Sequence, residues 1–507
     1  MITVLTLLPL IGGLVLLASC RSREAARMTA VLFAAASLAV VVLLWIGFNP
    51  ASAGLQFEEW HEWAPSLGIF YHVGADGLGI LMVTLAAVVT LMSLAASWAN
   101  KKQGPTYYAL VLFLESGLFG TFTALNFVHW FIFWELSLIP AYFLVRLWGG
   151  SQRARAANQF FLYTMVGSIA LLLAFLALYL GTGQFDFLRL ADLAHNGQIF
   201  PTLAQNLHWA GSPDRLAMLL FWAAFLGFAV KTPVVPFHTW LPAAYSEAPS
   251  ETTMLLTGAM SKMGVYGFLR ILVGIFPQQM EQARTTLLWF AVATIVLPAF
   301  AAWAQKDLKR TFAYSSVNHL GYCILGVCAA AHFAGTQTEK AAALTGVLLQ
   351  VFSHALTAAA LFWFIALLER RSGGLRGIDD FGGLRKIVPV LSGLMGIAIF
   401  ASLGLPGLNG FPGEFLIFKG SFALTPWATS ISVLGLLMTA VFLLTVIQKV
   451  FSGPVNPRWQ AMPDLTLTER LALAPAMILM LVLGLYPQII AGMVSGAVNQ
   501  WAAGVRF

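Results

Sequence analysis

Charged residues are scarce in this chain of 507 residues. Asp, Glu, Lys and Arg together make up 10% of it, whereas a soluble domain carries about 25%. Hydrophobic residues make up 59%, and the mean hydropathy is +0.81. This composition excludes an ordinary soluble domain and predicts an all-α protein that crosses a membrane many times.

Cysteine and cofactor-binding motifs are scarce as well. Cys20, Cys323 and Cys328 have neither a paired framework nor metal-ligand spacing, so we expect them to be small buried hydrophobic residues. The chain has no Walker motif, no G-x-G-x-x-G and no Cys/His cluster. We therefore expect no metal, nucleotide, flavin or iron–sulfur centre on this chain.

The chain has no hydrophilic stretch long enough for a soluble domain. Its longest breaks, 49–76 and 182–216, both contain aromatic residues and are expected to lie on the outer membrane surface. The first apolar run, Ile2–Ala18, lacks a basic n-region and a small-residue cleavage site, so it is interpreted as a span and not as a signal peptide.

Apolar runs are numerous enough for about 14 membrane-spanning helices. Each such helix needs about 20 predominantly apolar residues. The expected spans are roughly 2–19, 28–48, 77–98, 108–126, 127–147, 158–181, 217–239, 252–275, 285–303, 312–333, 342–367, 387–420, 427–450 and 471–494.

Lysine and arginine are distributed unevenly between the two sides of these spans. If the N-terminus is outside, the inner loops hold nineteen: Arg21, Arg23, Arg27, Lys101, Lys102, Arg146, Arg153, Arg155, Lys306, Lys309, Arg310, Arg370, Arg371, Arg376, Arg385, Lys386, Lys449, Arg458 and Arg470. The outer loops hold five: Arg189, Arg215, Arg284, Lys340 and Arg506. This bias predicts an inner plasma-membrane protein with its N-terminus on the periplasmic side. The net charge of +7 then reflects topology and indicates no nucleic-acid partner.

Two expected spans are interrupted by proline and glycine. One contains Lys231-Thr-Pro-Val-Val-Pro236, and the other contains the glycine- and proline-rich run Gly404–Gly413. Proline removes a backbone donor and clashes with the preceding turn. Both helices are therefore expected to be discontinuous near mid-membrane, although two ordinary proline kinks would leave the same signature.

The interrupted spans are five spans apart and run in opposite directions, as expected for two inverted repeats of five helices. The predicted organisation is residues 1–107 for helices 1–3 and 108–275 for the first repeat, with helix 7 broken. Residues 285–450 form the second repeat, with helix 12 broken, and 451–507 carry helix 14.

Four charged residues lie within apolar stretches: Glu135, Lys231, Lys262 and Glu414. A charge at the centre of a bilayer costs roughly 3 kcal/mol on insertion scales. At 1.5 Å per helical residue, Glu135 lies about 18 Å from the inner end of its span and Glu115 about 10 Å. The pattern predicts a path for protons or ions, with Glu115 on the inner side. A static Glu135–Lys231 ion pair is the alternative.

Histidines accompany these charges. His319 and His354 lie inside spans, and His238 follows the first proline interruption. The imidazole group titrates near neutral pH and suits a relay between a carboxylate and a lysine. The alternative for each is a hydrogen-bonded packing residue, and this alternative is strongest for His238.

The same residues carry a family resemblance. The relevant stretches are Phe133-Trp-Glu-Leu-Ser-Leu-Ile-Pro140, Val230-Lys-Thr-Pro-Val-Val-Pro-Phe-His-Thr-Trp-Leu-Pro242, Lys262-Met-Gly-Val-Tyr-Gly-Phe-Leu-Arg270, Ala313-Tyr-Ser-Ser-Val-Asn-His319 and Leu405-Pro-Gly-Leu-Asn-Gly-Phe-Pro-Gly-Glu414. Over nearly the whole chain the sequence resembles the antiporter-like subunits of respiratory complex I. Glutamate at position 414, where most relatives have lysine, and the short C-terminal end resemble the M-type chain, the counterpart of mitochondrial subunit 4.

The resemblance implies a proton-translocating subunit of an NADH:quinone oxidoreductase. It implies that Glu135 pairs with Lys231, that Lys262 is the central relay, and that His319 and His354 connect it to Glu414 on the exit side. NAD, flavin, iron–sulfur clusters and quinone are then expected on partner subunits. The expected partners are L-type and N-type chains and small membrane subunits, within lipid.

Departures from the family pattern are also present. The family often reads Leu-Pro-Asp-Ala-His where this chain has Leu241-Pro-Ala243-Ala-Tyr245, so the inner-side route is expected to differ. Lys419 is an additional charge near Glu414. The alternative functions are a subunit of an Mrp-type Na⁺/H⁺ antiporter, a subunit of a membrane-bound hydrogenase, and a scaffold that does not pump.

Overall fold

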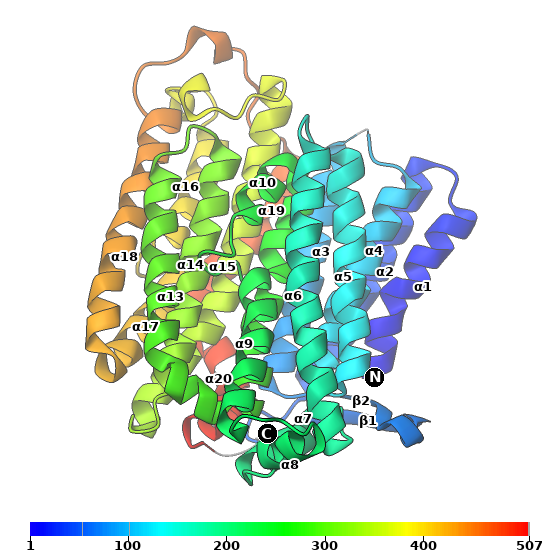
Figure 1. Cartoon of the computed structure of the whole chain (residues 1–507). Coiled ribbons are helices and arrows are strands. Elements are labelled where there is room, and N and C mark those ends of the chain that lie inside the picture. Colours follow the sequence, from blue (N-terminus) through cyan, green and yellow to red (C-terminus); the bar gives the residue numbers. More distant parts are fainter. Residues whose placement is uncertain (53, 101, 505–507) are drawn as a thin grey trace.

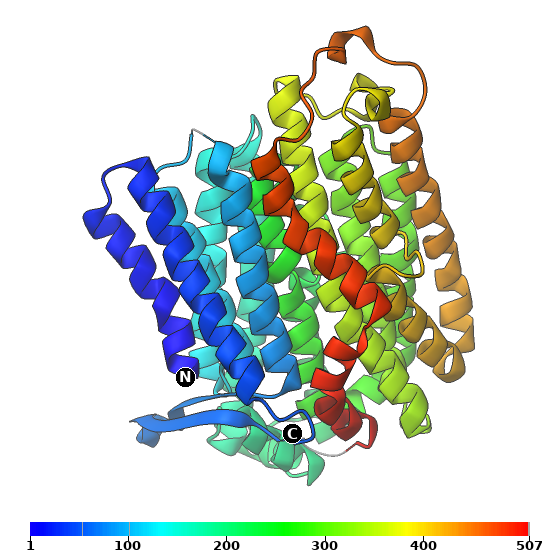
Figure 2. The same ribbon diagram turned by 180° about the vertical axis from the view of Figure 1, so that it is seen from behind.

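The computed structural model describes residues 1–52, 54–100 and 102–504 as a bundle of helices standing side by side (Figure 1). Lys101 and Arg506, both counted above among the loop charges, lie outside the described residues. The start of the first helix and the end of the last one lie at the same end of the bundle, as an even number of crossings requires (Figures 1 and 2).

Ten helices in the described part of the chain are long and apolar enough to cross a membrane. They are α1 (Ile2–Ser19), α2 (Arg23–Gly47), α3 (Gly77–Ala96), α5 (Phe127–Trp148), α6 (Arg153–Thr182), α9 (Pro213–Lys231), α13 (Pro277–Trp303), α15 (Gln337–Ser372), α18 (Pro426–Val446, continued by a π-helical turn to Phe451) and α19 (Leu467–Leu485).

The other four expected crossings are formed differently. Two are single helices, α4 (Pro105–Thr123) and α14 (Leu308–Ala330). One is the series α11 (Ser250–Leu255), a π-helical segment, α12 (Lys262–Gly267) and a second π-helical segment ending at Val273. The last is α16 (Pro389–Ser402) followed by α17 (Gly410–Leu424). The predicted all-α polytopic fold with about 14 crossings is confirmed.

The two predicted helix breaks are confirmed. Helix α9 ends at Lys231, and α10 (Trp240–Glu247) resumes the crossing after a stretch of turns. Helix α16 ends at Ser402, and α17 starts at Gly410. In Figure 1, α9 rises from the end that carries the termini, whereas α16 starts at the opposite end. The repeats are therefore inverted.

Polar partners satisfy the backbone where the helices are broken, as is required away from water. At the first break, the Val235 amide donates to Thr294 Oγ1 at 2.9 Å. At the second, Asn409 Nδ2 donates to the carbonyl of Ser353 at 3.0 Å. Gly404 and Gly407 have φ of +75° and +92°, which glycine adopts without steric penalty.

The last crossing differs from the prediction of one continuous span over 471–494. Helix α19 ends at Leu485, and α20 (Gln488–Ala502) begins after Pro487. Proline disfavours helical geometry at the residue before it and readily starts a new helix, so the apolar run is divided there. Figure 2 shows α19 crossing the back of the bundle obliquely before the chain turns into α20.

The end that carries the termini is covered by a β-hairpin and short helices (Figure 1). Strands β1 (Gln56–Ala64) and β2 (Ile69–Ala75) pair antiparallel, with Trp60 opposite His72. Helices α7 (Phe187–His195) and α8 (Ile199–Asn206) lie beside them. His72 connects the hairpin to the short helices, because its Nδ1 is 2.5 Å from Oδ2 of Asp186, which precedes α7.

The opposite end is held by charged residues at helix ends and in the loops. Arg370 pairs with Glu251 at 2.6 Å, and Arg376 pairs with Asp307 at 2.6 Å. Asp464 accepts hydrogen bonds from the first amides of α16, including that of Val390 at 2.9 Å. Partial burial opposes ionisation of Asp464, but these backbone hydrogen bonds outweigh it and lower the pKa of the carboxyl group.

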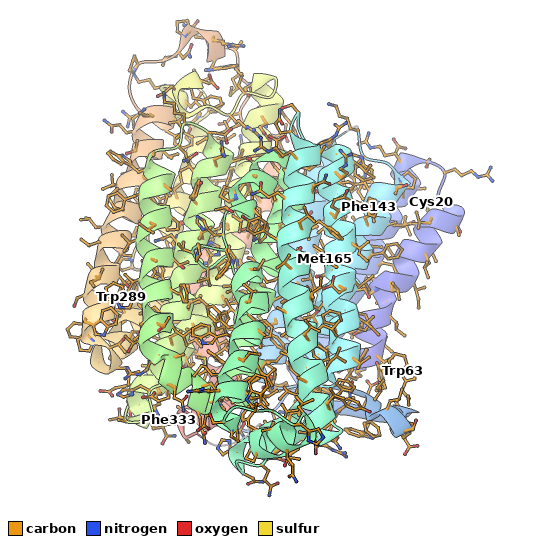
Figure 3. All side chains as sticks on the ribbon, viewed as in Figure 1. Cys20, Trp63, Phe143, Met165, Trp289 and Phe333 are labelled. Carbon is orange, nitrogen blue, oxygen red and sulfur yellow. The ribbon has the colours of Figure 1, made fainter. Side chains whose placement is uncertain are left out.

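The sides of the bundle are apolar. Large hydrophobic side chains such as Phe143 and Trp289 are exposed on its flanks. Figure 3 shows Met165 midway along α6, and Trp63 and Phe333 toward the end with the termini. An apolar flank of this kind suits a lipid environment or neighbouring membrane subunits.

Candidate proton-relay site

Lys262 lies on α12, between two π-helical segments, and its side chain is fully buried. π-Helical turns are uncommon and frequently mark functional positions. Gly264 allows α12 to approach the end of α9 closely, because a Cβ there would lie 2.7 Å from the Thr232 amide nitrogen. Local sequence thus brings Lys262 beside the first helix break.

The Lys262 ammonium group contacts three polar groups. Its Nζ lies 2.9 Å from Nδ1 of His354 on α15 and 3.4 Å from Ser261 Oγ. It also donates to the carbonyl of Thr257. These contacts support a buried amine, and no carboxylate among the described residues forms an ion pair with it.

The contacts continue from His354 towards the second helix break. The rings of His354 and His319 have centroids 5.1 Å apart. His319 Nδ1 lies 3.2 Å from Glu414 Oε1, and the ring's Nε2 lies 3.1 Å from Ser402 Oγ. Lys262, His354, His319 and Glu414 therefore form one buried row across α12, α15, α14 and α17.

A small cavity lies along this row, bordered by both histidines, Ser402 and Glu414. It has room for about one water molecule. A water here would lie between polar groups that already have the geometry for proton transfer, so the two imidazole rings need not touch.

Close helix packing positions Glu414. A Cβ at Gly346 on α15 would lie 2.5 Å from the Ile417 amide, and one at Gly413 would lie 2.7 Å from the Gln350 amide. Small residues of this kind let membrane helices approach closely. Gln350 Nε2 then donates to Glu414 Oε1 at 3.3 Å.

The first half of the chain has a looser arrangement. Lys231 Nζ is 3.5 Å from Ser137 Oγ and 4.6 Å from the centre of the Trp134 ring. Among the described residues there is no Glu135–Lys231 ion pair within 4.0 Å, although the carboxylate acts on the amine through an attractive Coulomb interaction. Glu135 is half-buried, and its Oε1 has no hydrogen-bond partner.

The remaining expected site residues lie apart from the row. Glu115 is fully buried on α4, and neither carboxylate oxygen has a hydrogen-bond partner. Because α4 begins at Pro105, Glu115 lies ten residues from its start, about 15 Å and deeper than expected. His238 is half-buried near Tyr314, with 6.4 Å between ring centres. Lys419 is exposed on α17.

The unusual stretch after Trp240 falls within α10. Ala243 leaves a small side chain there, and Tyr245 is fully buried. The Tyr245 hydroxyl lies near Thr257 and Ser261, the two residues that contact the Lys262 ammonium group, and it has no direct hydrogen-bond partner among the described residues. The tyrosine thus brings a polar group from the loop side of the break towards Lys262.

Comparisons with known proteins agree with this architecture. Residues 124–441 match the family described as NADH:quinone oxidoreductase/Mrp antiporter, TM. The NADH-quinone oxidoreductase subunit M of Rickettsia conorii is 34% identical, over 98% of this chain and 98% of that protein. The F(420)H(2) dehydrogenase subunit M of Methanosarcina mazei is 33% identical, over 99% of each chain.

A chain of the respiratory complex I from Thermus thermophilus has the same fold. It superposes with a TM-score of 0.85 at 28% identity, and the match covers 100% of both chains. This chain belongs to the M-type antiporter-like subunits. The M-type assignment agrees with the glutamate at position 414 and with the break that precedes it.

Several residues of the M-type site were not singled out from the sequence. Gln350, Ser402 and Thr257 all contact members of the row. Gln350 lies four residues before His354, and this spacing on a helix was a usable signal. Ser402 and Thr257 carried no such signal, since both reach the site only through helix packing.

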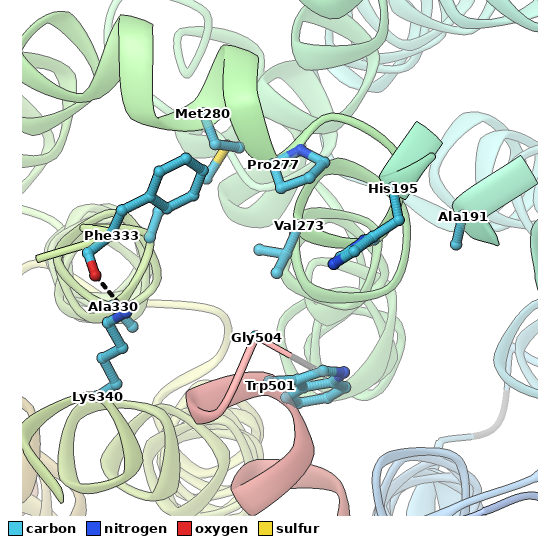
Figure 4. A pocket seen from close by; sticks show the side chains of 12 residues that line it. Ala191, His195, Val273, Pro277, Met280, Ala330, Phe333, Lys340, Trp501 and Gly504 are labelled. Carbon is cyan, nitrogen blue, oxygen red and sulfur yellow. Dashed lines mark hydrogen bonds between the residues drawn. The ribbon is translucent and has the colours of Figure 1, made fainter. Parts of the chain in front are cut away.

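One further pocket of this chain lies outside the row. A pocket near the terminal end of the bundle is lined by His195, Lys340 and Trp501, and Lys340 Nζ donates there to the Phe333 carbonyl at 3.3 Å (Figure 4). None of the expected site residues borders it. The described residues also contain no group of three or more His, Cys, Asp or Glu side chains arranged to hold a metal.

Proposed function

We propose that this chain carries protons across the membrane as the M-type subunit of an NADH:quinone oxidoreductase, or of a relative with a related electron donor. The supporting observation is the buried row from Lys262 to Glu414. Every member can gain and lose a proton, and successive members are in contact or separated by a distance that one water can bridge.

In this proposal Lys262 is the central carrier. Its ammonium group gives a proton to His354 Nδ1, and the proton passes through the small cavity to His319. His319 passes it to the Glu414 carboxylate, which releases it on the exit side. Gln350 and Ser402 hold Glu414 and His319 in place, and Tyr245 and Ser261 connect Lys262 to the inner side.

Glu135 and Lys231 are proposed to couple this row to the neighbouring subunit. When the charge opposite Lys231 changes, the electrostatic potential at the first helix break changes with it, and no atom has to travel. Glu115 and His238 are proposed as additional titrating groups on the inner side and at the break. The alternative for Glu135 and Lys231 remains a static structural pair.

The redox chemistry is proposed to take place elsewhere in the complex. NAD, flavin, iron–sulfur clusters and quinone would be held by partner subunits, and L-type, N-type and small membrane subunits would pack against the apolar flanks. The Methanosarcina mazei relative belongs to an F(420)H(2) dehydrogenase, so the choice of electron donor is assigned to the partners.

The proposed location is the inner (plasma) membrane, with the N-terminus in the periplasm. To test this, Cys20, Cys323 and Cys328 are replaced by serine or alanine, and single cysteines are placed at the exposed residues Arg153, Lys386 and Gln205. We expect an impermeant thiol reagent to label only Gln205→Cys in intact cells, because the lysine- and arginine-rich loops face the cytoplasm. Labelling of Arg153→Cys or Lys386→Cys would contradict the proposed orientation and indicate the opposite one.

The proton-carrying role is tested by comparing two lysines. Lys262→Met removes the buried carrier, and we expect proton pumping per electron in reconstituted vesicles to fall by at least about tenfold. Lys419→Met removes the same charge from an exposed position and is the matched control, with no expected change. Equal pumping by both variants at equal assembly, measured by mass spectrometry of the purified complex, would exclude the relay through Lys262.

A further inference from the structure

An apolar groove is bordered by α2, α3 and α19, three helices that lie on the back of the bundle (Figure 2). Two adjoining hollows, with volumes of about 450 and 410 Å³, share Ala95, Trp98 and Ala472 in their walls. The larger one is lined by aliphatic side chains together with Met92 and Trp98, and both volumes fall in the range of small-molecule sites. The apolar walls include Val31, Leu38, Val88, Leu91, Ala476 and Leu479.

The length of the groove along the helices matches the thickness of one leaflet of a bilayer. Along α3 and the turn that follows it, the groove extends from Val88 to Trp98, and along α19 it extends from Ala472 to Leu479. Ten residues between Trp98 and Val88 correspond to about 15 Å, which is half of the roughly 30 Å hydrocarbon core. A membrane-spanning helix of a partner would need a groove twice as long, whereas an acyl chain of one leaflet fits this length.

Positive charge lies at the loop end of the groove. Arg27 stacks on the Trp98 ring with its guanidinium carbon 3.6 Å from the ring centre, and it donates to the Trp98 carbonyl at 3.1 Å. Arg23 donates to the same carbonyl at 3.4 Å. Trp98 itself is 43% exposed, as is usual for tryptophan at a membrane interface.

These two arginines differ from the other arginines at the groove. Arg370 pairs with Glu251 at 2.6 Å, and Arg371 pairs with Glu469 at 2.6 Å, so both are already neutralised. Arg23 and Arg27 form no ion pair with any described residue, and the Nε atom of each is buried without a hydrogen-bond partner. The groove therefore ends in two guanidinium groups that have no acidic partner among the described residues.

We propose that this groove binds an anionic phospholipid of the leaflet on the loop side. Its phosphate lies against Arg23 and Arg27 beside the Trp98 ring, and one acyl chain lies between α3 and α19. Guanidinium groups recognise phosphate through paired hydrogen bonds, and the apolar walls exclude water from the chain. The bound lipid would fill the gap that the oblique path of α19 leaves against α3.

Two variants separate the headgroup from the acyl chain. Arg23→Gln/Arg27→Gln removes the phosphate contacts, and Arg153→Gln/Arg155→Gln is the matched control with the same change of charge on α6. Ala472→Phe fills the groove, and Ala35→Phe adds the same bulk at an exposed position of α2 outside it. The whole complex is purified in detergent, and its retained phospholipids are counted by native mass spectrometry.

We expect Arg23→Gln/Arg27→Gln and Ala472→Phe each to lose one bound anionic phospholipid per complex, while both controls keep it. A photoreactive amino acid at Leu91 should form an adduct with phosphatidylglycerol after reconstitution in vesicles that contain it. Retention of the lipid by both test variants would overturn the proposal. A Leu91 adduct with a partner subunit would overturn it too, because a protein segment would then occupy the groove.

Discussion

The two inverted repeats place their charged groups in different surroundings. In the second repeat, His319 and Glu414 are 3.2 Å apart and belong to a row that starts at Lys262. In the first repeat, Lys231 contacts Ser137 and Trp134, and Glu135 stays half-buried with an unpartnered oxygen. The same helix pattern thus gives a completed network, the row of contacting residues that ends at Glu414, in the second repeat. In the first repeat it gives an open pair, Glu135 and Lys231, two described residues that form no ion pair with each other.

Helix position explains the difference. The apolar window of α15 is 100% buried inside the chain, whereas that of its counterpart α6 is 39% buried. Because α15 supplies Gln350 and His354, the second site is complete within this chain. The first site lies nearer the flank, and we expect a neighbouring subunit to complete the surroundings of Glu135. The two repeats therefore share the same arrangement of helices, but the segments packed around each site differ.

The largest effect is expected at Glu414, because it ends the completed network. Glu414→Gln removes the titrating group and should lower pumping per electron by about a hundredfold, which is the scale of losing one general acid–base group. Glu414→Asp should reduce pumping mildly, since a carboxylate remains. Glu414→Lys should retain partial function, because a lysine amine can also gain and lose a proton. The measurement is proton uptake into reconstituted vesicles.

Assembly must be matched in this comparison, and Ser421→Ala on the same helix serves as a control that leaves the row untouched. Normal pumping by Glu414→Gln would remove Glu414 from the pathway. It would also show that the contacts around Glu414 in the second repeat give it no advantage in proton transfer over the Glu135–Lys231 pair of the first.

A smaller effect is expected at the open pair. If the surroundings were dry, Glu135→Gln would leave Lys231 unpaired at a cost of roughly 3–5 kcal/mol. Since the two groups form no ion pair within 4.0 Å and Glu135 is half-buried, we expect the complex to assemble in both Glu135→Gln and Lys231→Ala while pumping falls strongly. Melting temperature and pumping are measured on the same preparations. Unchanged pumping in both variants would mean that the pair is structural.

The smallest effect is expected at Tyr245. Tyr245→Phe removes one hydroxyl beside Thr257 and Ser261 and keeps the ring. A hydrogen bond made by this hydroxyl through a water molecule contributes about 1 kcal/mol, so turnover should fall about fivefold with the stoichiometry of pumping unchanged. Tyr142→Phe on the exposed face of α5 is the control. If Tyr245→Phe turned over as fast as the control, the inner-side route would not pass this hydroxyl.

The amino-acid sequence by itself determined the membrane crossings and both broken helices. Apolar length, the lysine and arginine bias and the prolines near Lys231 and Glu414 act locally, within one or two turns of helix. These features also identified the four charges and the histidines, since an ionisable residue in an apolar run is visible without any partner. The division of the last crossing at Pro487 belonged to the same class of signal.

Only the tertiary structure decided which of these groups meet. Lys262 and His354 are separated by 92 positions and His319 and Ser402 by 83. Their contacts depend on how α12, α14, α15 and α16 pack, at glycines that permit approach within van der Waals distance. The separation of Glu135 from Lys231 and the groove beside Trp98 were invisible for the same reason. Hydropathy records whether a residue enters the membrane, whereas rotation and tilt of each helix decide which neighbour it faces.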